Sequence, residues 1–417
     1  MFAYHFIWTF PLFFFLPLKR FVKNQRLRER FALDSNFPLP AKSNIWIHAL
    51  SVGEVISALP LVDALQTKYS DQGVVFTVTT KSGMTVAEEK LKNRGIRLQY
   101  MPLDAWWILR KFVRHIRPSV FVLVETDIWP GLLDWLQRKG VRSILVNGRI
   151  SPRTFRAYNK ARFFVRKFFD PLELCLMQSD LDRNRLLRIG IPERKVRTTG
   201  NIKFDQKWVA MSRKEREEWS YRLKIKPGTF LWVAGSTHPG EEEILLDVFM
   251  RIRASFPDFR LILAPRDIGR SSEIMEMVSK RDLKWVLRSR LSAGEGAEWD
   301  VLVLDTMGEL GRIYGLAGVS FVGGSLVRVG GHNLLEPASF GCPILFGPYT
   351  HNFVWLSSML LEWEGGWCVH DAASLHDALK SLLMDSESRA QMGEHARAFV
   401  ESNSGALERV LELIFPK

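Results

Sequence analysis

The sequence has 417 residues, enough for two or three domains. Its 47% hydrophobic and 25% charged residues exclude a polytopic membrane protein, and its 29 glycines and 19 prolines exclude collagen-like, low-complexity and disordered chains. Three cysteines, Cys175, Cys342 and Cys368, favour a reducing compartment over a disulfide framework, and no Cys/His cluster has zinc-ligand spacing. The net charge of +13 indicates an anionic partner, which could be nucleic acid, phospholipid or a phosphorylated substrate.

The N-terminus predicts a membrane anchor. Residues 1–18 contain no Lys, Arg, Asp or Glu, and as a helix they would reach about 27 Å, close to the thickness of the bilayer core. Residues 19–30 hold six basic residues against Glu29 alone and supply +5 of the net charge, which favours a cytoplasmic flank. The segment lacks the basic start and the cleavage site of a signal peptide, so we expect it to be retained. Pro11 and Pro17 leave open whether it spans the bilayer or lies in the interface, and an apolar helix folded into the core is the alternative.

After this segment, short apolar runs alternate with longer amphipathic stretches, which is typical of βαβ units around a parallel sheet. A first series predicts strands at 45–50, 74–80, 96–101, 119–125, 143–147 and 173–178, with helices such as 54–68 and 82–93 between them. A second series predicts strands near 229–234, 260–264, 301–304, 318–322 and 343–346. We therefore expect two Rossmann-like domains, with the carboxyl ends of both sheets around a shared ligand-binding cleft.

The run HALSVGE at 48–54 places a carboxylate at the start of a helix. Glu54 would face the cleft, and the positive helix N-terminus would favour its ionised form, as a general base requires. An acidic residue in a first helical turn is also a common helix cap. His48 on the preceding strand fits a core histidine equally well.

The run AGSTHPGEEE at 234–243 follows a predicted strand and precedes a helix. Main-chain N–H groups and the hydroxyls of Ser236 and Thr237 could hold a phosphate there, and an ordinary turn is the alternative. The glutamates that follow, 241–243, would repel a phosphate, so we expect them to face solvent. The run has neither the Walker A nor the GxGxxG pattern.

The run GGSLVRVGGHNLLEP at 323–337 places two glycine pairs before a short helix expected to start near Asn333. The glycines allow close approach to a ligand, and Glu336 could accept hydrogen bonds from two ribose hydroxyls. Arg266, at the end of a predicted strand, adds a guanidinium suited to phosphate or base. A flexible loop with a capped helix is the alternative.

Residues 149–167 contain seven basic residues, no acidic residue and four aromatic residues. Such a face suits an anionic, partly apolar partner. A phosphorylated lipid fits the predicted anchor, whereas nucleic acid would leave the anchor without a role. A solvated basic helix face is the alternative.

Taken together, these motifs resemble the Kdo (3-deoxy-D-manno-octulosonic acid) transferases of lipopolysaccharide biosynthesis. The resemblance runs from about residue 40 to 360 and rests on SVGE (51–54), ETDIWP (125–130), NGRIS (147–151), GNIKFD (200–205), AGSTHPGEEE (234–243), APR (264–266), GGHNLLEP (330–337) and GP..HNF (347–353).

The resemblance implies an α/β protein of GT-B glycosyltransferase fold that transfers Kdo from CMP-Kdo to a phosphorylated lipid A precursor. It further implies inverting, metal-independent transfer with no cofactor, at the cytoplasmic side of the inner membrane, with an anionic membrane surface rather than nucleic acid as partner. Glu54 is the implied general base. The implied CMP-binding residues are Ser236, Thr237, His238, Arg266, Gly331, His332, Asn333 and Glu336, with Lys203 as an addition.

For the acceptor we predict Arg153, Arg156 and Lys160. The expected organisation is an anchor and basic flank at 1–33, an acceptor-binding domain at 34–205, a linker region at 206–228 and a CMP-sugar-binding domain at 229–417. Two positions depart from the family pattern, Asp267 where His is usual and Gly131 where Asn is usual. Two other functions remain open, a GT-B enzyme that uses a UDP-sugar and a membrane-attached nucleotide-sugar-binding protein without catalysis.

Overall fold

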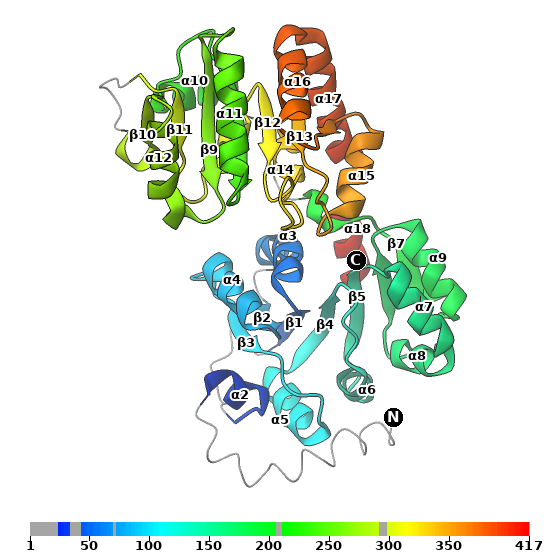
Figure 1. Ribbon diagram of the computed structural model, residues 1–417. Coiled ribbons are helices and arrows are strands. Elements are labelled where there is room, and N and C mark those ends of the chain that lie inside the picture. The colour runs from blue at the N-terminus through cyan, green and yellow to red at the C-terminus, as the bar shows by residue number, and fades with distance from the viewer. Residues whose placement is uncertain (1–23, 34–42, 70–71, 206–210, 292–297, 417) are drawn as a thin grey trace. The chain divides into compact units, whose positions relative to one another are not determined.

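The computed structural model describes residues 24–33, 43–69, 72–205, 211–291 and 298–416 (Figure 1). The chain divides into two compact units. The first comprises 1–206 and 403–417, and the second comprises 207–402. Each unit is built on a seven-stranded sheet, in agreement with the predicted Rossmann-like α/β architecture. The shared cleft between the units stays a prediction.

The first unit has its strands in the order β3-β2-β1-β4-β5-β6-β7, and every pair is parallel. The strands are β1 Asn44–Ala49, β2 Gly73–Val78, β3 Arg97–Tyr100, β4 Pro118–Val124, β5 Arg142–Gly148, β6 Leu174–Met177 and β7 Val196–Thr198. The helices are α2 Gln25–Arg30, α3 Val52–Lys68, α4 Lys81–Leu91, α5 Trp106–Ile116, α6 Pro130–Arg138, α7 Pro152–Lys160, α8 Arg162–Phe169, α9 Asp180–Ile189 and α18 Ala406–Ile414, with the 3₁₀ turns η2 Glu193–Lys195 and η3 Ile202–Asp205.

Both faces of this sheet are covered, which explains why its central strands are continuous apolar runs. Ile45 and Ile47 belong to a core that includes residues of α3, α4 and α18. Trp46, on the opposite face of β1, belongs to a second core with residues of α5, α6, α8 and α9. Alternate side chains of one strand therefore fill two cores.

The second unit repeats this architecture with the order β10-β11-β9-β8-β12-β13-β14, again all parallel. Its strands are β8 Phe230–Thr237, β9 Phe259–Pro265, β10 Trp285–Leu287, β11 Val301–Val303, β12 Val319–Val322, β13 Ile344–Phe346 and β14 Gly366–Cys368. Its helices are α10 Arg213–Arg222, α11 Glu241–Arg253, α12 Ser271–Ser279, α13 Leu310–Tyr314, α14 Leu335–Ser339, α15 Val354–Glu362, α16 Ala372–Met384 and α17 Ser386–Ser402, with the 3₁₀ turns η4 Ile268–Arg270 and η5 Arg288–Arg290.

The structure contains three strands that the sequence did not predict. These are β7, β10 and β14, each of three residues and each at the edge of its sheet. An edge strand this short carries too few residues to show an alternating or continuous apolar pattern.

The unit boundaries also differ from those expected. The last helix, α18, belongs to the first unit, whereas the sequence predicted one domain over 229–417. The Asp205 carboxylate accepts hydrogen bonds from the N–H groups of Gly405 and Leu407, and apolar residues of α18 fill the first unit's core. At the other boundary, α10 lies in the expected linker but packs in the second unit, where Leu223 is fully buried.

The predicted anchor lies largely outside the described residues, which begin at Asn24. Of its basic flank, α2 is described. Among the helices that the structure describes, none is both long enough and apolar enough to cross a bilayer.

Leu411→Ala in α18 tests the assignment of this helix. Leu411 is 4% exposed in the first unit's core, so we expect a loss of about 2–5 kcal/mol of unfolding free energy. Hydrogen exchange followed by mass spectrometry should show faster exchange in β1 and unchanged exchange in β8. Leu379→Ala in α16, fully buried in the second unit, should give the reverse pattern. Faster exchange in β8 for Leu411→Ala would contradict the assignment.

Candidate active site

In the first unit, Glu54 occupies the third position of α3, directly after β1. Its Oε2 accepts hydrogen bonds from the main-chain N–H groups of Leu50 and Ser51, the second at 3.1 Å. Among the described residues, none donates a hydrogen bond to Oε1. The helix cap that was the alternative to a catalytic base is therefore present, but it occupies only one carboxylate oxygen.

The surroundings of Glu54 favour its protonated form more than water does. Burial raises the pKa of Glu54 to about 7, and the negative charge of Glu125 adds to this effect. Asp127 contributes in the same direction, while the hydrogen bonds from Leu50 and Ser51 lower the pKa. A carboxylate with a pKa near neutrality can accept a proton and later release it.

Glu125 follows β4 in the left-handed backbone region, with φ of 59°. Its Oε1 accepts a hydrogen bond from Ser57 Oγ at 3.0 Å and lies 3.2 Å from Lys203 Nζ. Asn147, at the end of β5, accepts a hydrogen bond from Ile202 N at 3.1 Å and so holds the turn that carries Lys203. Lys203 thus lies in the first unit, whereas the other predicted CMP-binding residues lie in the second.

His48 is a buried histidine with contacts at both ring nitrogens. Nδ1 lies 3.1 Å from the Thr77 carbonyl and 3.0 Å from its hydroxyl, and Nε2 lies 3.6 Å from Asp127 Oδ2. Asp127 also accepts a hydrogen bond from Trp129 Nε1 at 2.7 Å. These contacts describe a histidine satisfied within the core, the interpretation that the sequence left open.

The predicted acceptor residues Arg153, Arg156 and Lys160 are exposed on α7. The next helix, α8, exposes two aromatic rings, Phe163 at 64% and Phe164 at 63%. The helix pair therefore combines exposed cations with an exposed apolar surface.

In the second unit, β8 ends in Gly235, Ser236 and Thr237. A Cβ atom at Gly235 would lie 1.9 Å from the Tyr314 hydroxyl, so only glycine fits. Ser236 adopts the left-handed backbone region with φ of 55° and is half-buried. Thr237 is 1% exposed, and its hydroxyl has no partner within the described structure.

Glu241, the first residue of α11, is fully buried and binds four main-chain N–H groups. Its carboxylate accepts hydrogen bonds from Gly324 at 2.7 Å, Ser325 at 3.0 Å, Leu326 at 2.9 Å and His238 at 3.0 Å. Burial raises the pKa of Glu241, and the four N–H donors act in the opposite direction. The Glu241 carboxylate therefore binds main-chain N–H groups at this turn, including that of His238, where the sequence suggested a phosphate.

The expectation that residues 241–243 face solvent is thus wrong for two of the three. Glu242 is also fully buried, and Arg270 donates a hydrogen bond to its Oε1 at 2.8 Å. Only Glu243 is exposed. Both carboxylates can be buried because Glu241 accepts hydrogen bonds from main-chain N–H groups and Glu242 pairs with the Arg270 guanidinium.

Arg266 is exposed directly after β9. The neighbouring Asp267, where the family usually has histidine, accepts a hydrogen bond from Gly269 N at 2.9 Å and caps η4. Asp267 thus has a local structural role. Gly131, the other departure, is buried and donates its N–H to Asp104 Oδ2 at 2.9 Å.

His238 and His332 form a close pair. Their Nε2 atoms lie 2.8 Å apart and their ring planes are within 4° of parallel. Burial lowers the pKa of His332 to about 4, with the charges of His238 and Arg266 as further causes, and burial also lowers the pKa of His238. Both rings are therefore neutral at pH 7, and one donates a hydrogen bond to the other.

The glycine-rich run that precedes α14 folds back on itself. The N–H groups of Gly330 and Gly331 both donate to the Gly324 carbonyl, at 3.0 and 2.7 Å, with left-handed φ of 113° and 77°. Asn333 accepts a hydrogen bond from Leu335 N at 3.1 Å, and Glu336 is half-buried. The helix expected near Asn333 begins two residues later and has five residues, so it offers less of an N-terminal anion site than predicted.

Within the described ranges, no group of three or more His, Cys, Asp or Glu side chains is placed to hold a metal ion.

Comparison with known proteins decides the family. Residues 25–206 match the family described as 3-Deoxy-D-manno-octulosonic-acid transferase (kdotransferase). A curated relative, the 3-deoxy-D-manno-octulosonic acid transferase of Haemophilus influenzae, is 34% identical over 396 residues, which cover 94% of this chain and 91% of the relative. The chain belongs to the Kdo transferase family. The family that the motifs indicated is confirmed, and the chain is a glycosyltransferase.

The solved structures that are similar to this Kdo transferase include the following two. UDP-GlcNAc 2-epimerase from Neisseria meningitidis bound to UDP-GlcNAc is 12% identical with a TM-score of 0.59, covering 89% of this chain and 98% of that one. At this identity the likeness concerns the fold alone. The C-terminal CMP-Kdo binding domain of WaaA from Acinetobacter baumannii is 28% identical with a TM-score of 0.42, covering 45% of this chain and 97% of that one.

Sequence reasoning gave no role to two residues that organise the site. Glu125 belongs to a motif used for the resemblance, but nothing local indicated that it raises the pKa of Glu54. Glu241 was expected in solvent because an inward carboxylate would repel a phosphate at this turn. A glutamate directly after Pro-Gly at a strand-to-helix turn was the available signal.

Glu241→Gln should destabilise the second unit of this Kdo transferase. The amide cannot accept four N–H groups as a carboxylate does and adds donors of its own, so we expect a loss of about 2–4 kcal/mol in urea unfolding. Glu243→Gln, an exposed change on the same helix, should stay within about 0.5 kcal/mol of the parent. Equal stability of the two variants would contradict the role of Glu241.

Proposed function

We propose that this chain transfers Kdo from CMP-Kdo to a hydroxyl group of a phosphorylated lipid A precursor, with Glu54 as the general base. The family membership supports the reaction. The observation that carries the residue assignment is the state of Glu54. It is a half-buried carboxylate with a pKa of about 7, and one of its oxygens has no donor among the described residues.

In this mechanism Oε1 of Glu54 accepts the proton of the acceptor hydroxyl. The acceptor oxygen forms a bond to the anomeric carbon of Kdo while the bond from that carbon to the CMP phosphate breaks, and the phosphate keeps the electron pair. Attack from the face opposite the phosphate inverts the anomeric configuration. The raised pKa matches the base to a hydroxyl proton at neutral pH.

For the donor we propose the second unit, where Ser236, His238, Arg266 and His332 lie at the carboxyl edge of the sheet. Arg266 carries a charge that would stabilise the leaving phosphate, and it influences the pKa of both histidines. The neutral histidine pair offers ring nitrogens for hydrogen bonds rather than charge.

The remaining predicted donor residues have supporting roles in this proposal. Gly331 and Asn333 shape the loop beside the histidine pair, and Glu336 would accept hydrogen bonds from ribose hydroxyls. Thr237 offers a buried hydroxyl. Lys203, in the first unit, would act through its ion pair with Glu125.

For the acceptor we propose the surface formed by α7 and α8. Arg153, Arg156 and Lys160 would bind the phosphates of the lipid, and the exposed rings of Phe163 and Phe164 would contact its acyl chains. We also propose that residues 1–33 attach the enzyme to the inner membrane, with both units on the cytoplasmic side.

Glu54→Gln tests the base. The amide keeps the size and polarity of the side chain but cannot accept the proton, so kcat should fall by about 100-fold to 10,000-fold while CMP binding stays nearly unchanged. Transfer of radiolabelled Kdo and calorimetric titration with CMP measure the two quantities. Near-parental turnover would refute the assignment.

Glu125→Gln should move the pH profile. If Glu54 must be ionised, kcat/KM falls as the pH drops below about 7. Loss of the neighbouring negative charge lowers the pKa of Glu54, so the acidic limb of the profile should shift by about one unit to lower pH. A limb that stays in place or moves to higher pH would show that another group controls it.

The acceptor surface is tested by the variant Arg153→Gln, Arg156→Gln, Lys160→Gln. In detergent, the KM for the lipid acceptor should rise while the KM for CMP-Kdo stays the same, because the proposed donor residues are on the other unit.

A control with the same charge change carries Arg251→Gln, Lys280→Gln and Lys380→Gln, three exposed cations of the second unit. It should keep both KM values. An unchanged acceptor KM in the α7 variant would mean that this face is only solvated.

A further inference from the structure

A groove of about 550 Å³ lies between α5 and the end of α6 in the first unit. Four cations line it, Arg110, Arg114, Arg117 and Lys139, and no acidic residue does. Val113 and Trp135 contribute to its apolar lining. The groove therefore offers concentrated positive charge beside an apolar surface.

Among the described residues, the cations of the groove have no anionic partner. In the part of the chain that the structure describes, no hydrogen bond or ion pair involves the guanidinium groups of Arg110, Arg114 and Arg117. Lys139 Nζ lies 5.6 Å from the centre of the Trp135 ring. Like charges held together repel one another, so an anion that binds among them lowers the energy of the site.

The same cations continue along α5. Trp106 is 44% exposed at the start of the helix, and Arg110, Arg114 and Arg117 follow at the fourth, eighth and eleventh positions after it. This spacing places Trp106, Arg110 and Arg114 on one face of the helix, and Arg117 follows directly after its last residue. Tryptophan is enriched at membrane–water interfaces, and arginine near such an interface is attracted to anionic headgroups.

The groove is distant from the proposed base. Pro118, which lines the groove, begins β4, whereas Glu125 follows the end of that strand. Seven strand residues extend over roughly 20 Å. A ligand in the groove is therefore not the group that reacts at Glu54.

The chain that follows the predicted anchor packs against α5. Lys111 Nζ donates to the Ala32 carbonyl at 2.8 Å, and Leu103 N donates to the Arg30 carbonyl at 2.9 Å. Figure 1 shows α2 beside α5, with α6 close to α5 in the same unit. An anchor that ends at α2 would bring the exposed face of α5 close to the lipid headgroups.

We propose that this groove binds the headgroup of an anionic phospholipid. The guanidinium groups match a phosphate in charge and in hydrogen-bond geometry, and the apolar wall accommodates the start of an acyl chain. The choice of a lipid over a free phosphate rests on the membrane location proposed above. The site would hold the first unit on the bilayer independently of the acceptor surface on α7 and α8.

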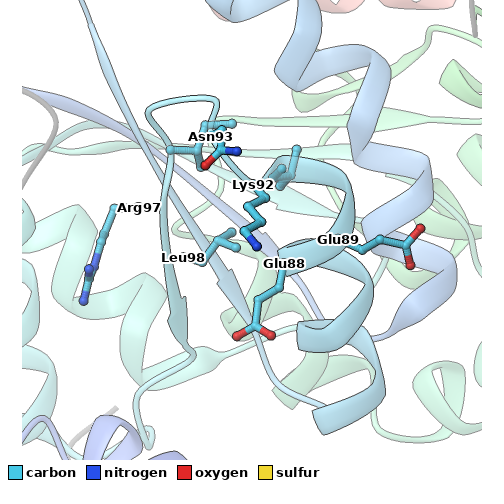
Figure 2. Close-up of a pocket in the computed structure, with 8 residues that line it drawn as sticks. Glu88, Glu89, Lys92, Asn93, Arg97 and Leu98 are labelled. Carbon is cyan, nitrogen blue, oxygen red and sulfur yellow. The ribbon is translucent and has the colours of Figure 1, made fainter.

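A second cavity of similar size has a different charge pattern. The cavity between α4 and β3, of about 560 Å³, has Glu88 and Glu89 opposing Lys92 and Arg97 in its lining (Figure 2). Balanced charge gives no reason to select an anion there.

The test uses the full chain in non-ionic detergent and the variant Arg110→Gln, Arg114→Gln, Lys139→Gln. Arg117 is kept because it closes α5 in a left-handed backbone. Calorimetry with short-chain phosphatidylglycerol below its micelle concentration should show binding that weakens about 100-fold in the variant. Phosphatidylcholine with the same chains and inorganic phosphate should both bind much more weakly to the parent.

Three results would overturn the proposal: equal phosphatidylglycerol binding by parent and variant, an equal loss in the Arg251, Lys280 and Lys380 control, or inorganic phosphate binding as tightly as phosphatidylglycerol. Kdo transfer to a detergent-dispersed acceptor should be unchanged in the groove variant. Failure of transfer by the parent would contradict the proposed function and leave the lipid site standing.

Discussion

Parallel strand pairing determines where the chemistry of this enzyme can lie. In a parallel sheet all strands end at the same edge. The segments that follow β1 and β4 therefore bring Glu54 and Glu125 close to Asn147 at the end of β5, although about ninety residues separate Glu54 from Asn147. The second sheet likewise gathers the ends of β8 and β9, where Ser236 and Arg266 lie. Each unit therefore gathers its candidate site residues at one edge of its sheet.

Glu54 and Glu241 both lie near the start of a helix, but their carboxylates have different hydrogen-bond donors. Glu241 gives its carboxylate to four main-chain N–H groups and fixes the loop that supports the histidine pair. Glu54 gives one oxygen to two N–H groups and keeps the other free of described donors. Burial raises the pKa of both, but only Glu54 has an oxygen available for a proton. Both residues follow a glycine at a strand-to-helix turn, and the number of N–H donors is what distinguishes them in the structure.

The sequence predicted the main strands of both sheets because buried parallel strands are continuous apolar runs, and it predicted Glu54 because a motif marked it. It could not predict the edge strands β7, β10 and β14, which are too short to show a pattern, or the return of α18 to the first unit, which depends on contacts across about two hundred residues. The burial of Glu241 escaped prediction for the same reason, because three of its four N–H donors come from a loop more than eighty residues later. The local sequence pattern therefore predicts where helices and strands lie, whereas their packing partners depend on contacts between residues far apart in the chain.

Transfer of radiolabelled Kdo from CMP-Kdo to a tetraacylated, phosphorylated lipid A precursor tests the proposed activity most directly. We expect label in the lipid product, release of CMP in equal amount, and no transfer from UDP-sugars. CMP-Kdo binding without labelled product would show a nucleotide-sugar-binding protein without catalysis. Transfer from a UDP-sugar instead would contradict the proposed donor.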